Sequence, residues 1–309
     1  MNQSTHACQE AHAKSLSRRL QPLRLGLRWH VRGLLRKPRS ILVELRSRLS
    51  DEVMALPLYG ALKRAWPDCR IAVRCNFPDL LVDHPHVDLV NPENFAFDRF
   101  IHLRGGPRNR YRILHYAKQA RVAPPKSRPH IFYNDWSTPL LQPVLVSRKP
   151  IIALCPGSSW PAKRWDLDFW KTLGRMLLDT GYGIVELGVA EDPLIDVGIS
   201  LRGLTTVHEA ACILHAAKLA ITTDSGLMHL ALAADTPTIA LFGPTNPAIV
   251  IHDEPRLNAL TNGRPCQACW NRFRMTEKGI CPVGIPECLG TIRPETVFEQ
   301  AKEVLDAAE

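Results

Sequence analysis

The chain has no apolar run approaching the about 20 residues that a membrane-spanning helix needs. It also lacks a signal-peptide pattern, because arginines interrupt the leucines of its N-terminal part. Internal repeats and low-complexity tracts are missing as well. A cytoplasmic location is therefore expected. With 309 residues, 45% of them hydrophobic, the chain is long enough for two α/β domains of ordinary size.

Acidic residues are absent from one long segment, Lys14 to Arg39, which carries nine Lys or Arg and accounts for the net charge of +9. Its apolar residues recur at helical spacing, at Leu16, Leu20, Leu23, Leu27, Val31 and Leu34. We interpret residues 1–39 as a basic amphipathic extension that lies on an anionic membrane surface. The alternatives are a basic helix packed on the protein and a disordered arm. Nucleic-acid binding is not expected, because no nucleic-acid-binding motif accompanies the charge.

The nine cysteines are odd in number and come without an export signal, so a disulfide framework is not expected. Four of them fall within 23 residues of a loop (263–290) punctuated by Pro and Gly: Cys266, Cys269, Cys281 and Cys288. This spacing is typical of a tetrathiolate site for a structural zinc or iron, which would fold a loop that has no core of its own. Buried free thiols and disulfides are the alternatives.

Short apolar runs alternate with helical patterns in residues 40–148. The runs at 41–45, 70–73, 87–90 and 100–103 predict strands, separated by a loop (46–51), a helix ending near Trp66 and a helix from about 109 to 120. Such alternation predicts a parallel sheet. Residues 121–150 are rich in Pro and basic residues, and we expect a linker there with a short strand.

A second α/β run covers residues 149–309. It has predicted strands at 151–154, 183–187, 219–223 and 238–242, and predicted helices at 166–179, 207–217, 227–234 and 294–307. The sequence therefore predicts two parallel-sheet domains that follow one another along the chain.

The loop after the first strand of this second run contains Gly157, Ser158, Ser159 and Lys163. Glycine permits close backbone approach, the hydroxyls donate hydrogen bonds, and the lysine neutralises charge. Such a loop suits a diphosphate. It is not a Walker loop, because Gly-x4-Gly-Lys is absent.

A further strand–turn–helix unit is formed by Asp224-Ser225-Gly226 between two apolar runs. The turn places free backbone N–H groups and the positive end of a helix at a strand's carboxyl end, where α/β sheets bind phosphate-bearing ligands. Together with the Pro156–Lys163 loop and Phe242-Gly243-Pro244-Thr245-Asn246-Pro247, this order of motifs resembles glycosyltransferase family 9, the ADP-heptose heptosyltransferases of lipopolysaccharide core assembly. The resemblance covers essentially all of residues 40–305.

The resemblance implies a GT-B architecture, with two Rossmann-like domains facing each other across a cleft. Residues 40–148 would form the acceptor-side domain and residues 149–309 the nucleotide-sugar domain. It implies donor contacts from Ser158, Ser159, Lys163, Glu191, Thr205, Thr206, Asp224, Ser225 and Gly226. Lys163 would bind the diphosphate, Asp224 the heptose hydroxyls, Ser225 and Gly226 the phosphate through their N–H groups, Glu191 the nucleoside, and Thr205 and Thr206 the adenine.

Asp51 matches the family's candidate base, but Ser50 precedes it where the family usually has Gly. A Ser at a position that needs positive φ or a close acceptor would strain or narrow the acceptor pocket. The alternative is that Asp51 only stabilises a helix dipole. We interpret His229, on the predicted helix 227–234, as a structural core residue rather than a catalytic one.

The expected reaction is inverting transfer of heptose from ADP-heptose to a lipopolysaccharide core or related lipid-linked saccharide, at the inner face of the inner membrane. Asp51 would act as the base, and Lys163 with the N–H groups of Ser225 and Gly226 would stabilise the leaving diphosphate. We assign no Asp-x-Asp metal motif near the donor loops, so no cofactor is expected for catalysis. The alternatives are a heptosyltransferase acting on a protein of the autotransporter-adhesin type, and a degenerate member that binds nucleotide sugar without transferring it.

Overall fold

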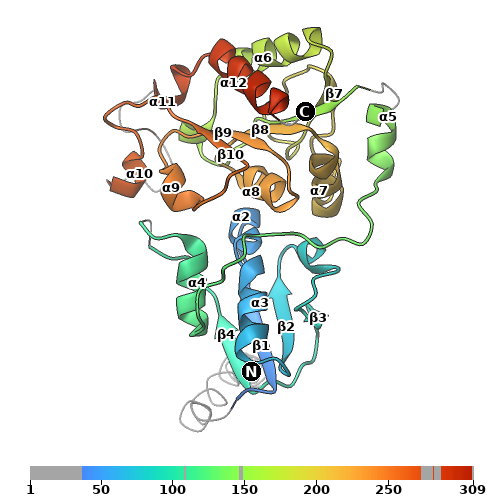
Figure 1. Ribbon diagram of the computed structural model, residues 1–309, viewed down its shortest axis with the longest axis vertical. Helices are drawn as coiled ribbons and strands as arrows, with labels where there is room; N and C mark the ends of the chain where they lie inside the picture. Colours follow the sequence, from blue (N-terminus) through green and yellow to red (C-terminus); the bar gives the residue numbers. More distant parts are fainter. Residues whose placement is uncertain (1–36, 108, 146–148, 273–280, 282–286, 308–309) are drawn as a thin grey trace, which may run out of the picture.

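The computed structural model describes residues 37–107, 109–145, 149–272, 281 and 287–307. These residues form two parallel sheets, each with its own helices, placed one above the other (Figure 1). The strand order is β3-β2-β1-β4 in the first sheet and β10-β9-β8-β5-β6-β7 in the second. The basic segment from residue 1 to residue 36 lies outside the described residues, and the predictions made for it stay predictions. The boundary expected at 148/149 also stays a prediction.

The lower unit in Figure 1 contains the first sheet. Its elements are β1 (Ser40–Leu45), α2 (Leu49–Val53), α3 (Leu56–Ala65), β2 (Arg70–Cys75), the 3-10 turn η1 (Pro78–Leu81), β3 (Leu89–Val90), β4 (Arg99–His102) and α4 (Arg112–Ala120). The four predicted strands and a parallel sheet are present. The loop predicted for residues 46–51 was too long, because α2 already begins at Leu49, with Asp51 and Glu52 in its first turn. Acidic residues are favourable at that end of a helix.

The upper unit contains the second sheet. Its elements are β5 (Ile151–Cys155), η3 (Pro161–Lys163), α6 (Leu167–Asp179), β6 (Gly183–Glu186), β7 (Ile199–Ser200), α7 (Val207–Ala216), β8 (Leu219–Thr223), α8 (Gly226–Ala233), β9 (Thr238–Leu241), α9 (Pro247–Val250), β10 (Leu257–Leu260), α10 (Cys269–Arg272), α11 (Glu287–Gly290) and α12 (Pro294–Asp306). Every residue of β5 and β8 is buried, as expected for central strands of a parallel sheet. The edge strands β7 and β10 were not foreseen, because one is two residues long and the other is only partly buried.

The segment that joins the two units contains no strand among its described residues, so the short strand predicted within 121–150 is wrong. It holds the turn η2 (Pro139–Leu141) and α5 (Gln142–Leu145) instead. The segment passes from one unit to the other, and the N–H of Ile131 donates to the carbonyl of Ala233 in α8. It therefore lies against a helix and not beside a strand.

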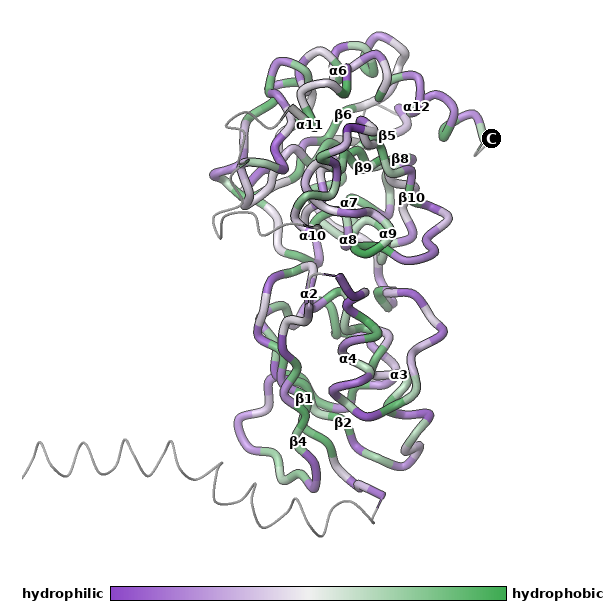
Figure 2. Tube along the Cα trace, turned by 90° about the vertical axis from the view of Figure 1, so that its left-hand side faces the viewer, coloured by the Kyte–Doolittle hydropathy of each residue, from purple (hydrophilic) through white to green (hydrophobic). Residues whose placement is uncertain are grey.

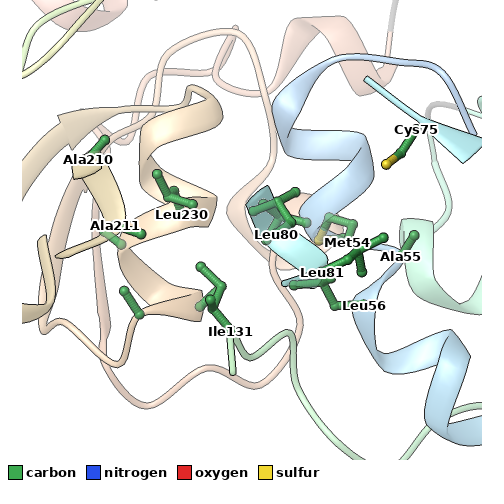
Figure 3. Close-up of a cluster of buried hydrophobic side chains, with 14 of the residues drawn as sticks. Met54, Ala55, Leu56, Cys75, Leu80, Leu81, Ile131, Ala210, Ala211 and Leu230 are labelled. Carbon is green, nitrogen blue, oxygen red and sulfur yellow. The ribbon is translucent and has the colours of Figure 1, made fainter. Parts of the chain in front are cut away.

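One continuous apolar cluster joins the two units. Met54, Leu80 and Leu81 of the lower unit lie opposite Ile131 and the α8 residue Leu230 (Figure 3). Figure 2, turned by 90°, shows the same two units one above the other, with hydrophobic residues along the strands of the lower sheet. At the junction, α2 contacts α8 (Figure 1). Within the part of the chain that is described, no helix has the length and hydrophobicity to cross a membrane.

Glu52 fixes the start of α2. Its side chain is buried, and its carboxylate accepts the backbone N–H groups of Ser47, Asn76 and Phe77 at 2.9–3.2 Å. The loop after β1 is thereby tied to the loop after β2. Burial raises the pKa of Glu52 from its ordinary value, although these N–H donors lower it.

We expect Glu52→Ala to destabilise the fold by about 1–3 kcal/mol, because it leaves backbone donors without an acceptor. Chemical unfolding with an unchanged denaturant slope would measure this loss. Asp68→Ala, at an exposed acid of the same unit, is the matched control. Equal stabilities of the two variants would show that Glu52 does not anchor α2.

Candidate active site

The candidate site lies where the strand order of the second sheet reverses, at β5. β5 has β8 on one side and β6 on the other, so the loops after β5 and β8 leave the sheet as neighbours. Ligands of α/β sheets bind at such switch points, beyond the carboxyl ends of the strands. Lys163, from the loop after β5, and Asp224, directly after β8, meet there with Nζ 2.6 Å from Oδ2.

This ion pair is nearly closed off from water, with 14% of the Lys163 side chain and 5% of the Asp224 side chain exposed. Thr245, after β9, donates its hydroxyl to the same Asp224 oxygen at 2.5 Å. Burial alone would raise the pKa of Asp224, but Lys163 and Thr245 lower it below the ordinary value. The site therefore holds a carboxylate that stays ionised at neutral pH, directly beside the Lys163 side chain.

The predicted phosphate-binding turn, Ser225-Gly226, follows Asp224 directly in the chain. Ser225 is the N-cap of α8 and makes no side-chain cap bond. Gly226 faces α2 so closely that an added Cβ would lie 3.2 Å from the Cβ of Leu49. The start of α8 thus points at the junction of the two units.

Asp51 lies at this junction, on α2. Its carboxylate accepts the Ser47 hydroxyl at 2.7 Å and pairs with the Arg112 guanidinium at 3.1 Å. The side chain is 20% exposed, so it is accessible to a ligand. Ser50 is not among the described non-glycine residues with positive φ. The backbone strain that Ser would have at a positive φ is therefore not present, whereas the narrowing of the acceptor pocket stays a prediction.

His229, one turn into α8, is buried. Burial lowers its pKa to about 4, although Asp224 and Asp51 act to raise it. His229 is thus neutral at neutral pH, and both carboxylates act on its pKa. This agrees with the interpretation of His229 as a core residue.

The two predicted donor serines differ in their surroundings. Ser158 is buried and its hydroxyl accepts the Trp160 N–H at 3.3 Å, whereas Ser159 is exposed. Gly157 has a clear structural reason, because an added Cβ would collide with the carboxylate of Asp192. That carboxylate accepts the Val189 N–H at 2.9 Å within the loop after β6, and it packs directly against Gly157 in the loop after β5.

Glu191, on this same loop, is exposed, and the contacts described for the chain do not link it to Lys163 or Asp224. Thr206 is the N-cap of α7 and forms a capping box with Glu209, which gives it a structural role that the sequence pattern Thr-x-x-Glu could have indicated. Thr205 precedes it and is partly buried. The structure therefore brings together Lys163, Asp224, Ser225 and Gly226, with Asp51 across the junction.

Three contributors were missed at the sequence level. Thr245 is part of the Phe-Gly-Pro-Thr motif, but nothing local indicates that its hydroxyl reaches Asp224. Arg112 is one of several arginines in and just before the first turn of α4, and Asp192 is one of several acids after β6. Their partners come from distant parts of the chain, so spacing carries no signal for them.

One Asp-x-Asp triplet does follow the donor loop, namely Asp166-Leu167-Asp168. Both carboxylates are exposed, and the side chain of Asp166 accepts the backbone N–H of Asp168 at 2.8 Å. Asp166 is the N-cap of α6. The triplet thus has a helix-capping role.

Of the four cysteines of the predicted metal loop, Cys266 is exposed and the other three are partly buried. Burial raises the pKa of Cys269 and brings that of Cys288 to about 11, and Cys266 and Cys281 add to the increase in both cases. The described residues nevertheless contain no group of three or more His, Cys, Asp or Glu placed to hold a metal ion. The tetrathiolate site remains a prediction.

Replacing Lys163 by Met should leave Asp224 as an uncompensated buried charge and destabilise the protein by about 2–4 kcal/mol at neutral pH. In the native protein the lowered pKa of Asp224 gives stability that is present above its ordinary pKa of 3.8 and is lost as pH falls through the lowered value. In the variant the pKa rises, so stability should instead fall as pH increases through the raised value. Thermal unfolding from pH 4 to pH 8 measures this, and a loss that is equal at every pH would contradict it.

The similarity of this chain to known proteins concerns its family and its fold. The family model described as glycosyltransferase family 9 (heptosyltransferase) matches residues 114–279. Among curated relatives, lipooligosaccharide heptosyltransferase 2 of Haemophilus influenzae is 32% identical over 180 residues, 53% of this chain and 50% of that protein. Lipopolysaccharide heptosyltransferase 2 of Escherichia coli is 31% identical over 177 residues, 52% of this chain and 48% of that protein. The chain thus spans about half the length of the curated relatives it matches.

Solved structures show the same fold. E. coli ADP-heptose lipopolysaccharide heptosyltransferase II superimposes with a TM-score of 0.63 at 21% identity, covering 87% of this chain and 99% of that one. The dodecameric iron-containing heptosyltransferase TibC, solved with ADP-D-β-D-heptose, gives a TM-score of 0.73 at 16% identity, covering 89% and 78%. The fold is therefore the GT-B fold that was predicted. With more than half of its residues matched by the family model, the chain belongs to glycosyltransferase family 9, the heptosyltransferases.

Proposed function

We propose that the protein transfers heptose from ADP-heptose, with inversion and without a catalytic metal ion, to a lipopolysaccharide core or related lipid-linked saccharide. One observation carries the proposal. Asp51 lies on α2, which contacts α8, and Asp224 of the Lys163–Asp224 pair lies directly before α8. Both carboxylates act on the pKa of His229 in that helix. A base near a site that binds the leaving group is what a single displacement at an anomeric carbon requires.

On the donor side, Lys163 and the N–H groups of Ser225 and Gly226 would bind the diphosphate. An ammonium group and a helix N-terminus both stabilise the negative charge that develops as the diphosphate leaves. Asp224, ionised and buried, would accept hydrogen bonds from heptose hydroxyls. Further donor contacts are proposed for Ser158, Ser159, Glu191, Thr205 and Thr206.

On the acceptor side, Asp51 would take the proton from the attacking hydroxyl. Ser47 and Arg112 hold its two oxygens, so the carboxylate has a fixed direction. Its partial exposure leaves room for an acceptor to approach. Arg112 also places a guanidinium group directly beside the proposed base.

The choice of acceptor follows the curated relatives, which are named as lipopolysaccharide or lipooligosaccharide heptosyltransferases. A protein acceptor finds support only in similarity to structures below 25% identity, which concerns the fold. A lipid-linked acceptor would place the protein peripherally at the inner face of the inner membrane, and the basic residues of Lys14 to Arg39 suit its anionic surface. A degenerate member without activity is not favoured, because Ser50 is not strained.

The four-cysteine loop is proposed to hold a structural zinc or iron. Cys266 and Cys281 are among the groups that raise the pKa values of Cys269 and Cys288, which supports a shared neighbourhood of these side chains. Thiolates suit either metal. Metal analysis of protein purified without added metal, alongside a Cys288→Ser variant, tests the proposal, and an absence of stoichiometric zinc or iron from the unmodified protein would refute it.

Asp51→Asn should lower the rate of heptose transfer about 10²–10⁴-fold, because the amide cannot accept the proton of the acceptor hydroxyl. The affinity for ADP should stay within a factor of about two, since Asp51 is not at the diphosphate. Transfer assays with ADP-heptose and calorimetry with ADP measure the two quantities.

The control for this variant is Glu44→Gln, at an acid of β1 that pairs with His102. Unchanged transfer in the Asp51 variant would remove this residue from the mechanism. Absence of ADP-heptose turnover in the unmodified protein, with any acceptor, would instead refute the proposed function itself.

A further inference from the structure

Two tryptophans extend the candidate site beyond the charged pair. The ammonium of Lys163 lies 4.5 Å from the ring centroid of Trp160, a cation–π distance. The ring of Trp160 meets that of Trp270 nearly edge to face, with centroids 4.5 Å apart and an interplanar angle of 70°. Trp270 belongs to α10, next to Cys269, in the four-cysteine loop.

Trp270 is itself fixed to the strand end that carries Thr245. Its backbone N–H donates to the carbonyl of Pro244 at 2.8 Å. The side chain of Gln267, three residues earlier, donates to the carbonyls of Phe242 and Gly243. The part of the cysteine loop around Gln267 and Trp270 is therefore hydrogen-bonded to the Phe-Gly-Pro-Thr segment.

Together, these contacts form a closed ring of neighbouring residues. We name as the contact ring the set Lys163, Asp224, Thr245, Trp270 and Trp160, in which Pro244 links Thr245 to Trp270. Its members come from the loops after β5, β8 and β9 and from the cysteine loop. Asp224 and Thr245 have short side chains, and Trp160 and Trp270 have rigid rings. Lys163, by contrast, has a long flexible side chain.

A lysine that binds a diphosphate must leave Asp224 in part and turn its ammonium towards the ligand. A flexible stem would lose much conformational entropy in doing so, unless a neighbour already restricts it. The face of Trp160 provides that restriction, and the ring of Trp270, packed against it nearly edge to face, keeps Trp160 from rotating away.

We propose that Trp270 is a positioning residue of the donor site, which directs Lys163 through the ring of Trp160. The proposal rests on the proposed role of Lys163 at the diphosphate. It gives the four-cysteine loop a part in donor recognition, although none of its cysteines contacts Lys163 in the contacts described.

The test is a double-mutant cycle with ADP as the ligand, measured by calorimetry on the full-length chain. Trp270→Ala should weaken ADP binding about fivefold, and Lys163→Ala about tenfold or more. In the double variant, loss of Trp270 should add nothing further, because its effect passes through Lys163. Trp270→Phe, which keeps an aromatic edge against Trp160, should restore affinity to within about twofold.

Trp66→Ala is the matched control, since Trp66 also carries a cation–π contact, with Arg99, but lies in the lower unit. It should leave ADP affinity unchanged. Thermal unfolding of each variant confirms that it is folded.

The outcomes are distinguishable. An ADP affinity unaffected by Trp270→Ala, or an equal loss in the presence and absence of Lys163, would overturn the positioning role while the donor assignment stands. An affinity unaffected by Lys163→Ala would refute the donor assignment and the positioning role with it.

Discussion

The structure depends on one buried ion pair, Lys163–Asp224, at the switch point of the second sheet. Two charges can stay in so dry a place only because each compensates the other and Thr245 supplies a further hydrogen bond. The pair brings together the ends of β5, β8 and β9, and so ties the three central loops of the upper unit to one point. Removing either partner would therefore disturb both the fold of these loops and their charge.

Helix α8 connects this pair to the rest of the molecule. Its first residue, Gly226, admits Leu49 of α2, and its buried face continues the apolar cluster that joins the two units. Asp51, two residues after Leu49 on α2, is thus brought to the junction because the lower unit is packed on α8. The placement of the candidate base is a result of hydrophobic packing, while its direction is set by Ser47 and Arg112.

How far the sequence could predict the structure depended on the range of the interactions. Buried runs such as Leu219–Thr223 predicted central strands, and loop motifs placed Lys163 and Asp224 at neighbouring strand ends. The strand expected in residues 121–150 was wrong, because that segment crosses between units and has α8 as its neighbour. Thr245, Arg112 and Trp270 could not be assigned, since their partners are set by tertiary contacts that leave no spacing pattern.

The contact ring has a consequence for the energetics of ligand binding. Its contacts are all made among the chain's own residues, so the loops after β5, β8 and β9 become ordered together as the protein folds. A preorganised site spends little of its interaction energy on ordering itself. The ADP binding that we propose should therefore show a small heat-capacity change, unlike that of a ligand that must fold its own binding loop. Substrate discrimination in such a site rests on fit to a fixed surface.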